Sequence, residues 1–254
     1  MKINPLERFS DRVENYIKFR PGYPDEIIRY LETEKILKTG DSIADVGSGT
    51  GISCELFLKY GYNVTGVEPN KEMRNSSIRL LSEYSNFKAV DGNSSDTNLK
   101  DKSVDLVSGF QAFHWFDIMK SKIEFKRILK NNGYAVFVWN TRKEDTEFLK
   151  DYESLLQKFG TDYKQVKHNN INHQTVVNYF DKNFKYVEFQ NSQKFDFDGL
   201  RGRLLSSSYA PNESDSLYNE MIFELEKIFK RHCLNEAVSF DYTTQVYSGS
   251  FNFN

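Results

Sequence analysis

Short apolar runs alternate with amphipathic helical stripes over residues 42–139, and this alternation limits the chain to few folds. Each run has the length of a buried strand. The expected strands are residues 42–46, 62–67, 87–90, 104–110 and 134–139. The expected helices are residues 52–60, 70–84 and 121–129, with a turn at Asn131-Asn132-Gly133. Strands that alternate with helices predict a mostly parallel sheet with helices on both faces.

The flanking segments have a different pattern. At the N-terminal end we expect helices at residues 6–18 and 25–38, separated by a proline-rich break. At the other end we expect a helix at 145–160, a strand at 184–197, a loop or short helix at 198–211, a helix from about residue 217 and a strand at 240–247. The sequence therefore predicts a Rossmann-like α/β fold, with a seven-stranded mostly parallel sheet, an antiparallel last strand and a helical cap inserted near the C-terminus.

The charge balance and the apolar pattern exclude several classes of function. A net charge of -2 over 254 residues gives no general attraction for nucleic acid. No apolar run approaches the roughly 20 residues that cross a bilayer, and residues 1–10 lack the apolar stretch of a signal peptide, so we expect a cytoplasmic protein that does not act in a membrane. Cys54 and Cys233 lie far apart, so no metal site is expected. No feature of the sequence requires a protein partner.

A glycine-rich loop follows the first expected strand. Gly47, Gly49 and Gly51 form a G-x-G-x-G pattern, and Ile52 stands where a dinucleotide-binding loop would have its third glycine. Glycines allow the backbone to turn sharply and to approach a ligand, and the helix that follows offers free N–H groups to an anionic group. Asp45, at the end of the strand, could accept a hydrogen bond from an ammonium group, directly or through water. The pattern indicates a ligand site at this edge of the sheet.

Glu68 ends the second expected strand. An acidic residue at this position can accept hydrogen bonds from both hydroxyls of a ribose. This property suits S-adenosylmethionine and NAD equally, so Glu68 by itself does not distinguish between them.

Taken together, four segments resemble the successive motifs of class I methyltransferases, which bind S-adenosylmethionine. The segments are Asp45-Val46-Gly47-Ser48-Gly49-Thr50-Gly51, Val67-Glu68-Pro69-Asn70, Met73 and Asp91-Gly92-Asn93-Ser94. The resemblance implies that Asn93 binds the exocyclic amine of adenine and that the Ser94 backbone binds the ring. The sequence departs from the pattern at Ser94-Ser95, where relatives often carry Ala-Glu. The cofactor-binding residues expected on this basis are Tyr16, Arg20, Asp45, Gly47, Gly49, Thr50, Gly51, Glu68, Pro69, Met73, Asn93, Ser94 and Gln111.

Two flanking segments are similar to a narrower group that includes trans-aconitate methyltransferase. They are Phe9, Tyr16 and residues 20–24 on one side, and residues 111–117 on the other, with a weaker similarity through Arg203 and residues 206–211. Members of this group act on different small molecules, so the acceptor does not carry over. The resemblance implies an N-terminal helical lid (1–40), an S-adenosylmethionine-binding core (41–190), a cap or substrate insertion (191–237) and a final core strand (238–254).

The residues of this flanking pattern carry chemistry suited to methyl transfer. Arg20 can grip the carboxylate of S-adenosylmethionine in a forked geometry, and Tyr16 can close over the same end, although a surface ion pair and simple packing are the alternatives. His114 can act as a general base or can orient its loop by hydrogen bonding. Trp115 offers an aromatic face to a cationic sulfonium.

Further substrate contacts are expected from the second half of the chain. Trp139 follows the fifth strand and is expected to border the pocket. Arg203 and Tyr209 provide donors suited to an acidic or polar substrate, and the alternative is a charged loop that packs on the cap. His168 and His173 lie in a polar stretch and are expected at the surface.

The sequence therefore favours transfer of a methyl group from S-adenosylmethionine to a small-molecule acceptor, which could be a carboxylate, with S-adenosylhomocysteine as the product. Positioning for an in-line displacement can supply much of the rate. Two alternatives stay open at this point. An NAD-dependent oxidoreductase is disfavoured by Ile52, and a non-catalytic module that binds S-adenosylmethionine is compatible with the same loop.

Overall fold

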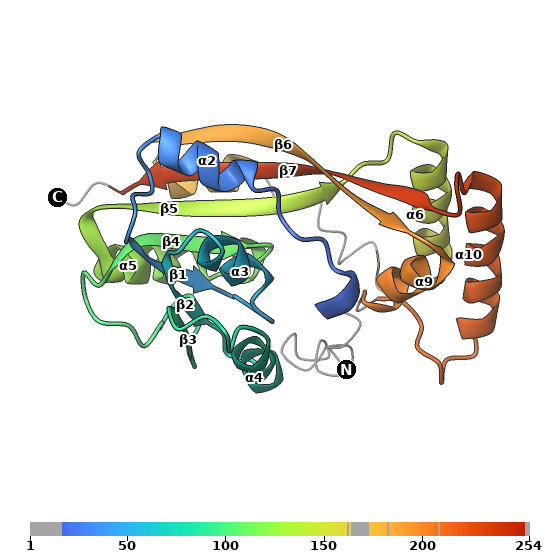
Figure 1. The fold of residues 1–254 in the computed structure, drawn as a ribbon, viewed down its shortest axis with the longest axis horizontal. Helices are drawn as coiled ribbons and strands as arrows, with labels where there is room; N and C mark the ends of the chain where they lie inside the picture. Colours follow the sequence, from blue (N-terminus) through green and yellow to red (C-terminus); the bar gives the residue numbers. More distant parts are fainter. Residues whose placement is uncertain (1–16, 162, 164–172, 182, 208, 252–254) are drawn as a thin grey trace. The chain divides into compact units, whose positions relative to one another are not determined.

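The computed structural model describes residues 17–161, 163, 173–181, 183–207 and 209–251 (Figure 1). Within them, seven strands form one sheet in the order β3-β2-β1-β4-β5-β7-β6. Strands β1 to β5 pair in parallel, and β7 runs antiparallel between β5 and β6. The strands are β1 (Ser42–Val46), β2 (Asn63–Val67), β3 (Phe87–Val90), β4 (Val104–Phe110), β5 (Leu129–Arg142), β6 (Phe184–Phe195) and β7 (Val238–Ser250). The predicted fold class is confirmed.

Helices occupy most of the segments between the strands. They are α2 (Glu26–Thr33), α3 (Ile52–Leu58), α4 (Lys71–Leu80), the 3-10 turn η2 (Phe113–Trp115), α5 (Ile118–Ile128), α6 (Glu147–Phe159), α8 (His173–Tyr179), α9 (Phe197–Leu205) and α10 (Tyr218–His232). Side-chain caps start several of them: the Asn70 side chain accepts from the Met73 N–H, and the Asp117 side chain accepts from the Lys120 N–H. Such caps satisfy backbone donors that a first helical turn leaves unpaired.

Some expected elements differ from the structure. The turn expected at 131–133 is wrong, because these residues lie within β5. The pairing of β4 with β5 shifts register between Val104 and Leu106, which accommodates the extra residues inside the strand. The segment expected as a loop or short helix at 198–211 overlaps the helix α9, which begins one residue earlier, whereas α8 was not predicted. The helix expected at 25–38 is shorter, and the one expected at 6–18 lies almost entirely outside the described residues.

The described residues divide into two compact units. The first, here called the core unit, takes its residues from 22–140, 171–189 and 244–254; the second, called the helical unit, takes them from 1–21, 141–170 and 190–243. These bounds differ from the segments expected from the sequence, since 22–40 joins the core unit and 141–170 joins the helical unit. The lid and cap roles of those segments stay predictions.

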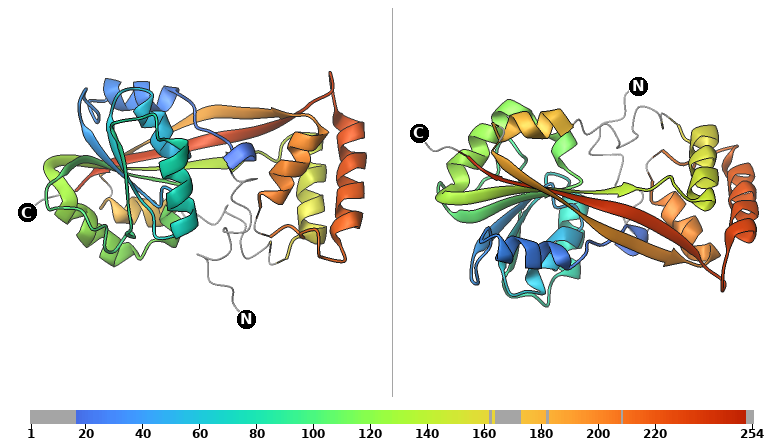
Figure 2. Two further views of the ribbon diagram at one scale, coloured as in Figure 1. Left: turned by 60° about the horizontal axis from the view of Figure 1, so that its bottom comes forward. Right: turned by 90° about the horizontal axis from the view of Figure 1, so that it is seen from above.

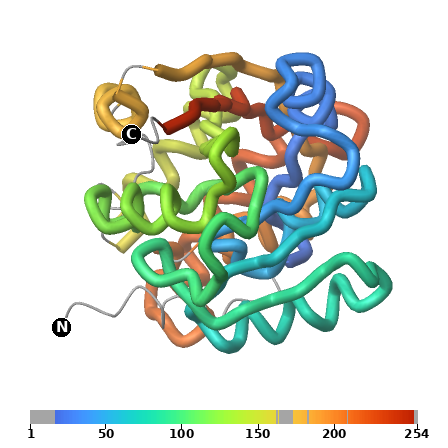
Figure 3. Tube along the Cα trace, turned by 90° about the vertical axis from the view of Figure 1, so that its left-hand side faces the viewer, coloured from blue at the N-terminus to red at the C-terminus, as the bar shows by residue number. Residues whose placement is uncertain are grey.

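The core unit has helices on both faces of its sheet, because alternate strand residues point to opposite sides. On one face Ile43, Val64 and Leu106 pack with α2 and α3. On the other face Ala44 and Val107 pack with α5 and α8. Figure 2 shows these two layers, and Figure 3 follows α4 in teal and α5 in green along the same unit.

The helical unit has its own apolar core. Buried residues of α6, α9 and α10 pack together with Phe240 and Tyr242 of β7. In the described part of the chain, no helix combines the length and the apolar character needed to cross a membrane.

Candidate active site

The loop after β1 adopts the conformation that its glycines allow. Gly47, Gly49 and Gly51 have φ values of +72°, +56° and +91°, in the left-handed region that other residues rarely adopt. The loop joins β1 to α3 at the edge where the parallel strands end, which is where ligands bind in open α/β sheets.

Two of these glycines are also required by packing against the protein. A Cβ atom on Gly47 would lie 2.7 Å from the Cβ of Ala112, and one on Gly51 would lie 2.7 Å from Cδ1 of Leu81. Both distances are too short for carbon atoms in contact. Ala112 is the second residue after the end of β4, so the glycine loop lies against the segment that contains His114.

Gly49 differs from its neighbours because no atom of the described residues crowds it. A Cβ atom at Gly49 would meet only Sδ of Met73, at 3.8 Å, which is an ordinary contact. The backbone of Gly49 therefore faces space that the described residues leave open. A glycine at this position suits the close approach of a ligand to the backbone.

Glu68 is held beside Gly49 by backbone donors. Its Oε2 accepts from the Gly49 N–H at 2.9 Å, and its Oε1 accepts from the Asn70 N–H at 2.8 Å. Burial raises the pKa of the Glu68 carboxyl, and these two hydrogen bonds offset only part of that rise. Each carboxylate oxygen keeps a second lone pair, so Glu68 can still accept bonds from ribose hydroxyls.

Two other expected residues belong to the same turn. Pro69 lies between Glu68 and Asn70, and Met73 is buried with its N–H bonded to Oδ1 of Asn70 at 2.9 Å. The side chain of Arg74 donates to the Glu68 carbonyl oxygen at 2.6 Å, which fixes this end of β2. The turn therefore holds the carboxylate in place before any ligand arrives.

Asp45 is completely buried and is satisfied by protein donors. Ser53 Oγ and Cys54 Sγ donate to its Oδ2 at 2.5 and 3.3 Å, and Ser108 Oγ donates to its Oδ1 at 2.7 Å. Burial raises the pKa of Asp45, and the three hydrogen bonds act against that rise. The carboxylate thus ties β1 to α3 and β4. Its expected contact with an ammonium group stays a prediction.

The segment expected to hold adenine forms a tight turn. Oδ1 of Asn93 accepts from the N–H groups of Ser95 and Asp96 at 2.8 and 3.2 Å, while the side chain is exposed. The atom that would accept from the adenine amine therefore already serves two backbone donors. Ser94 is buried in this turn. Both adenine contacts stay predictions, and that of Asn93 would have to compete with the turn.

Gln111 follows β4 at a φ of +52° and leaves an acceptor buried without a partner. Its N–H donates to the Val138 carbonyl at 2.8 Å, and its Nε2 donates to the Asn140 carbonyl at 3.0 Å. Within the part of the chain that the structure describes, its Oε1 has no hydrogen-bond partner, and neither has the buried Oγ1 of Thr50 in the glycine loop. Because buried polar atoms are nearly always paired, these two atoms indicate that a polar ligand completes the site.

Asn140 joins three segments of the core unit. Its Nδ2 donates to the Gly22 carbonyl at 3.0 Å, and its Oδ1 accepts from Thr244 Oγ1 at 2.6 Å. The main-chain carbonyl of Asn140 accepts the bond from Gln111, so these contacts join the start of the unit, the end of β4 and the strand β7 at one residue.

The aromatic segment after β4 divides between the core and the surface. Phe113 is buried, and the ring of Phe116 lies 3.8 Å from the position of a Cβ on Gly47. His114 and Trp115 are exposed, with ring centroids 4.8 Å apart. The surrounding protein lowers the pKa of the His114 imidazole to about 4 by desolvation. The lowered pKa keeps His114 neutral at pH 7.

Trp139 is enclosed in the core. It is 1% exposed and packs against Phe113 and Tyr247, with ring centroids 6.0 and 5.8 Å apart. Its Nε1 is a buried donor without a partner. That Trp139 borders a pocket stays a prediction, and Nε1 is the one atom that supports it.

The remaining expected residues lie in the helical unit or outside the described residues. Arg20 donates from Nη2 to the Ser206 carbonyl at 3.1 Å, and Arg203 and Tyr209 are buried. Tyr16, Phe9 and His168 lie outside the described residues. His173 is exposed as expected, and its Nδ1 lies 2.9 Å from Tyr247 Oη. The structure therefore brings together the glycine loop, Glu68 and Gln111, and places Arg203 with Tyr209.

Residues 44–137, which contain the glycine loop, Glu68 and Gln111, match the family described as methyltransferase domain. The chain carries a class I methyltransferase domain. An uncharacterized methyltransferase of Schizosaccharomyces pombe is 25% identical to it over 246 residues, which cover 94% of this chain and 95% of the relative. A solved structure from Anaeromyxobacter dehalogenans, a proposed type II methyltransferase, has a TM-score of 0.66 at 17% identity and covers 91% of this chain and 97% of its own, which supports the fold.

A second relative matches this methyltransferase over a shorter range. A methyltransferase-like protein of the same yeast, also uncharacterized, is 29% identical over 158 residues, which cover 62% of this chain and 60% of the relative. The chain thus spans less than two thirds of that relative. The narrower resemblance to the group with trans-aconitate methyltransferase stays a prediction.

S-adenosylmethionine is the cofactor of this methyltransferase family. The core unit offers groups that suit it: an uncrowded backbone at Gly49, an acceptor at Gln111 Oε1 without a partner among the described residues, and the carboxylate of Glu68. Across the described residues, no cluster of three or more His, Cys, Asp or Glu side chains is arranged to hold a metal ion.

Several supporting residues were missed by the sequence analysis. Ser53 and Ser108 satisfy Asp45, but isolated serines in apolar elements give no signal of their partner. Glu153 could have been identified from the sequence as a buried carboxylate, because it lies on the buried face of α6 between Tyr152 and Leu155. A carboxylate on the apolar face of a helix requires a partner.

Proposed function

We propose that this methyltransferase transfers the methyl group of S-adenosylmethionine to a small-molecule acceptor that carries a carboxylate. The observation that carries the first part is the pairing of Gly49 with Glu68, at 2.9 Å, at the end of β1 and β2. S-adenosylmethionine supplies an activated methyl group on a cationic sulfur. The protein then needs to bind the cofactor and the acceptor, to orient the acceptor in line with the methyl group, and to exclude water. Its residues can perform these tasks.

In this proposal the core unit binds the cofactor. Glu68 holds the ribose, and the free Oε1 of Gln111 accepts from the ammonium group. Thr50 offers a buried hydroxyl, and the N-terminal end of α3 receives the carboxylate. Asp45 acts through Ser53 and Ser108, which it fixes by hydrogen bonds.

For the acceptor we infer a different set of roles. Trp115 offers an exposed aromatic face, which suits a cationic sulfonium. His114 is neutral at pH 7 and orients the acceptor, since an ionised carboxylate needs no base to act as a nucleophile. Arg203 supplies the cation that recognises a carboxylate, because no acidic residue in the described chain lies within ion-pair distance of it.

The proposal is tested by separate binding and turnover measurements. Calorimetry should detect S-adenosylmethionine and S-adenosylhomocysteine but not NADH, and a panel of carboxylic acids should include at least one that yields S-adenosylhomocysteine. The methyl ester of that acid should give no turnover if the carboxylate is the recognised group. Binding of NADH alone would refute the cofactor, and cofactor binding without turnover on any acceptor would indicate a non-catalytic module.

A further inference from the structure

Arg203 of the helical unit carries a buried positive charge that no carboxylate of the described residues neutralises. It is 6% exposed, and its Nε donates to Tyr242 Oη at 3.2 Å. Its Nη1 donates to the hydroxyls of Ser206 and Ser207, both at 3.3 Å. None of the described residues accepts from Nη2, and none places an acidic oxygen within 4.0 Å of the group. A buried charge whose partners are neutral hydroxyls and the ring of Phe240 is unfavourable until an anion joins it.

A second arginine of the same unit is already neutralised. Arg142 forms an ion pair with Glu153, and both side chains are nearly buried, at 13% and 8% exposure. Tyr163 completes this group, since its hydroxyl lies 3.0 Å from Nη2 of Arg142 and 2.5 Å from Oε2 of Glu153. Oε1 of Glu144 lies 4.0 Å from Nη2 of Arg142, and the Glu144 side chain is 36% exposed, so water screens its charge. The Nε of Arg142 is buried without a hydrogen-bond partner.

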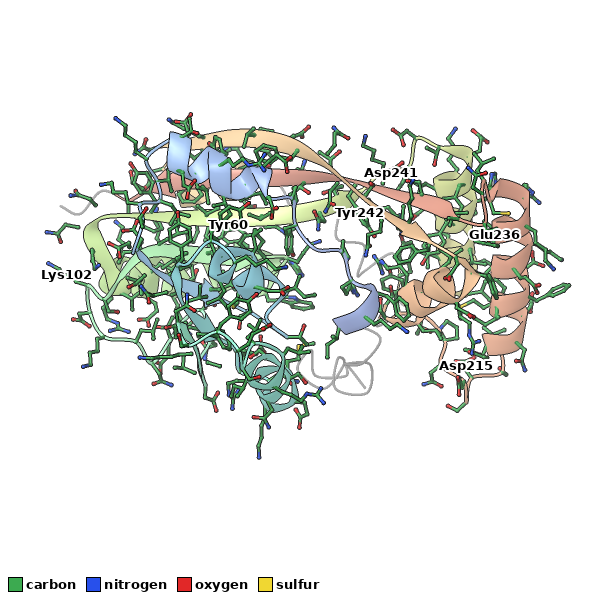
Figure 4. The ribbon with its side chains drawn as sticks, in the orientation of Figure 1. Tyr60, Lys102, Asp215, Glu236, Asp241 and Tyr242 are labelled. Atoms are coloured by element: carbon green, nitrogen blue, oxygen red, sulfur yellow. The ribbon has the colours of Figure 1, made fainter. Side chains whose placement is uncertain are left out.

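The two arginines belong to one cluster around a single ring. The guanidinium carbons of Arg142 and Arg203 lie 5.9 and 5.4 Å from the centroid of Phe240. Tyr242, labelled in Figure 4, projects from the same strand β7. The ring of Tyr152 lies 5.3 Å from the guanidinium carbon of Arg142.

The charges of the buried groups do not balance. Arg142 and Arg203 contribute two positive charges and Glu153 contributes one negative charge, which leaves a net charge of one. Burial raises the pKa of Tyr152 and of Tyr163, so both phenols stay neutral near pH 7. Among the described residues, the cluster therefore lacks one negative charge.

We propose that this cluster binds a singly charged carboxylate group of the ligand, with Arg203 as its partner, and that Glu153 sets the charge that the site accepts. The inference rests on the proposed function only in assigning that carboxylate to the methyl acceptor. A phosphate monoester carries about 1.5 to 2 negative charges at pH 7, which exceeds what the cluster can balance. The planar fork of a guanidinium also matches a carboxylate.

The test compares ligands that differ mainly in charge. Benzoate, terephthalate, phenyl phosphate and benzamide, together with straight-chain monocarboxylates of increasing length, are titrated into the full chain without S-adenosylmethionine. We expect a monocarboxylate to bind at least about tenfold more tightly than its doubly charged counterpart and than the neutral amide. Equal binding of benzamide, or no binding by any monocarboxylate, would overturn the proposal. Binding of S-adenosylmethionine is measured in a separate titration, so a failure of carboxylate binding is distinguishable from a failure of cofactor binding.

Three variants test which residues are responsible for carboxylate binding and for its charge preference. Arg203→Met should abolish carboxylate binding without lowering the melting temperature of the ligand-free protein, because it removes an unbalanced buried charge. Arg201→Met is the matched control, since Arg201 lies on the same helix α9, is 41% exposed and should leave binding unchanged. A carboxylate affinity that Arg203→Met leaves intact would contradict the assignment.

Glu153→Gln tests the role of charge by itself. It removes the negative charge of Glu153 while keeping the shape of the side chain, so the net charge of the cluster rises by one and the preference should shift toward terephthalate and phenyl phosphate by about tenfold. An unchanged ratio of affinities for the singly and doubly charged ligands would show that Glu153 does not set the accepted charge.

Discussion

Replacing Gly49 with alanine should separate cofactor binding from folding. The φ of Gly49 is +56°, and alanine in the left-handed region costs roughly 1–2 kcal/mol. No clash adds to this cost, because the new methyl group would meet only Sδ of Met73, at 3.8 Å. For a chain of this size each kcal/mol lowers the melting temperature by about 2–4 °C, so we expect a decrease of about 2–8 °C.

The effect on S-adenosylmethionine should be larger than this loss of stability suggests. The methyl group would occupy the space that the backbone of Gly49 leaves open, and it would move the ligand away from Glu68. We expect the Kd to rise about 10- to 100-fold, which corresponds to about 1.4–2.8 kcal/mol. Isothermal titration calorimetry with S-adenosylhomocysteine measures this change, and circular dichroism confirms that the variant is folded.

Two other glycines make the result specific. Gly61 has a φ of +81° with no atom within 4 Å of its added Cβ, so Gly61→Ala should lose similar stability and keep its affinity. Gly47→Ala should be less stable than either, because overlap with Ala112 adds about 1–3 kcal/mol. A folded Gly49→Ala protein that binds the cofactor as tightly as the wild type would refute the placement of the ligand.

Two further predictions concern titratable residues. Only an ionised Glu68 accepts from both ribose hydroxyls, and burial raises its pKa above the ordinary 4.5, so affinity for S-adenosylmethionine should be complete at neutral pH and should fall on acidification earlier than an ordinary glutamate would allow. Glu68→Gln should bind more weakly, with a smaller pH dependence in the same titration. His114→Ala should reduce turnover only modestly, by about 2- to 10-fold for an ionised acceptor. Initial rates of the wild-type protein should be flat from about pH 6 to 8, because the lowered pKa keeps His114 neutral over that range. Total loss of turnover with intact cofactor binding would instead identify His114 as the base.

The sequence was sufficient for the parts of the fold that depend on local pattern. Strands β1, β3 and β4 were expected at their observed bounds, because short apolar runs between glycines and helical stripes leave little choice. Strand β5 was expected too short, since Asn131-Asn132-Gly133 has the composition of a turn. The shifted pairing with β4 holds those residues in the strand, and a partner strand is not visible in local sequence.

The candidate site was predictable in its residue types but not in its partners. Gly49 and Glu68 were identified from their spacing, and the hydrogen bond between them follows from the adjacent positions of β1 and β2. The complete burial of Asp45 could not be predicted, because it depends on Ser53 from α3 and Ser108 from β4. Long-range contacts of this kind arise only when the strands assemble.

The position of β7 has a consequence for how the chain is made. β6 is synthesised before β7 but pairs with the sheet only through it, because β7 lies between β5 and β6. Until residues 238–250 have left the ribosome, β6 has no neighbour and Asn140 lacks the hydroxyl of Thr244. In a growing chain, the edges of β5 and β6 that β7 will cover therefore stay unpaired until a late stage of translation. Such edges favour aggregation. Variants that slow the insertion of β7 should lower the yield of folded protein more than their equilibrium stability would suggest.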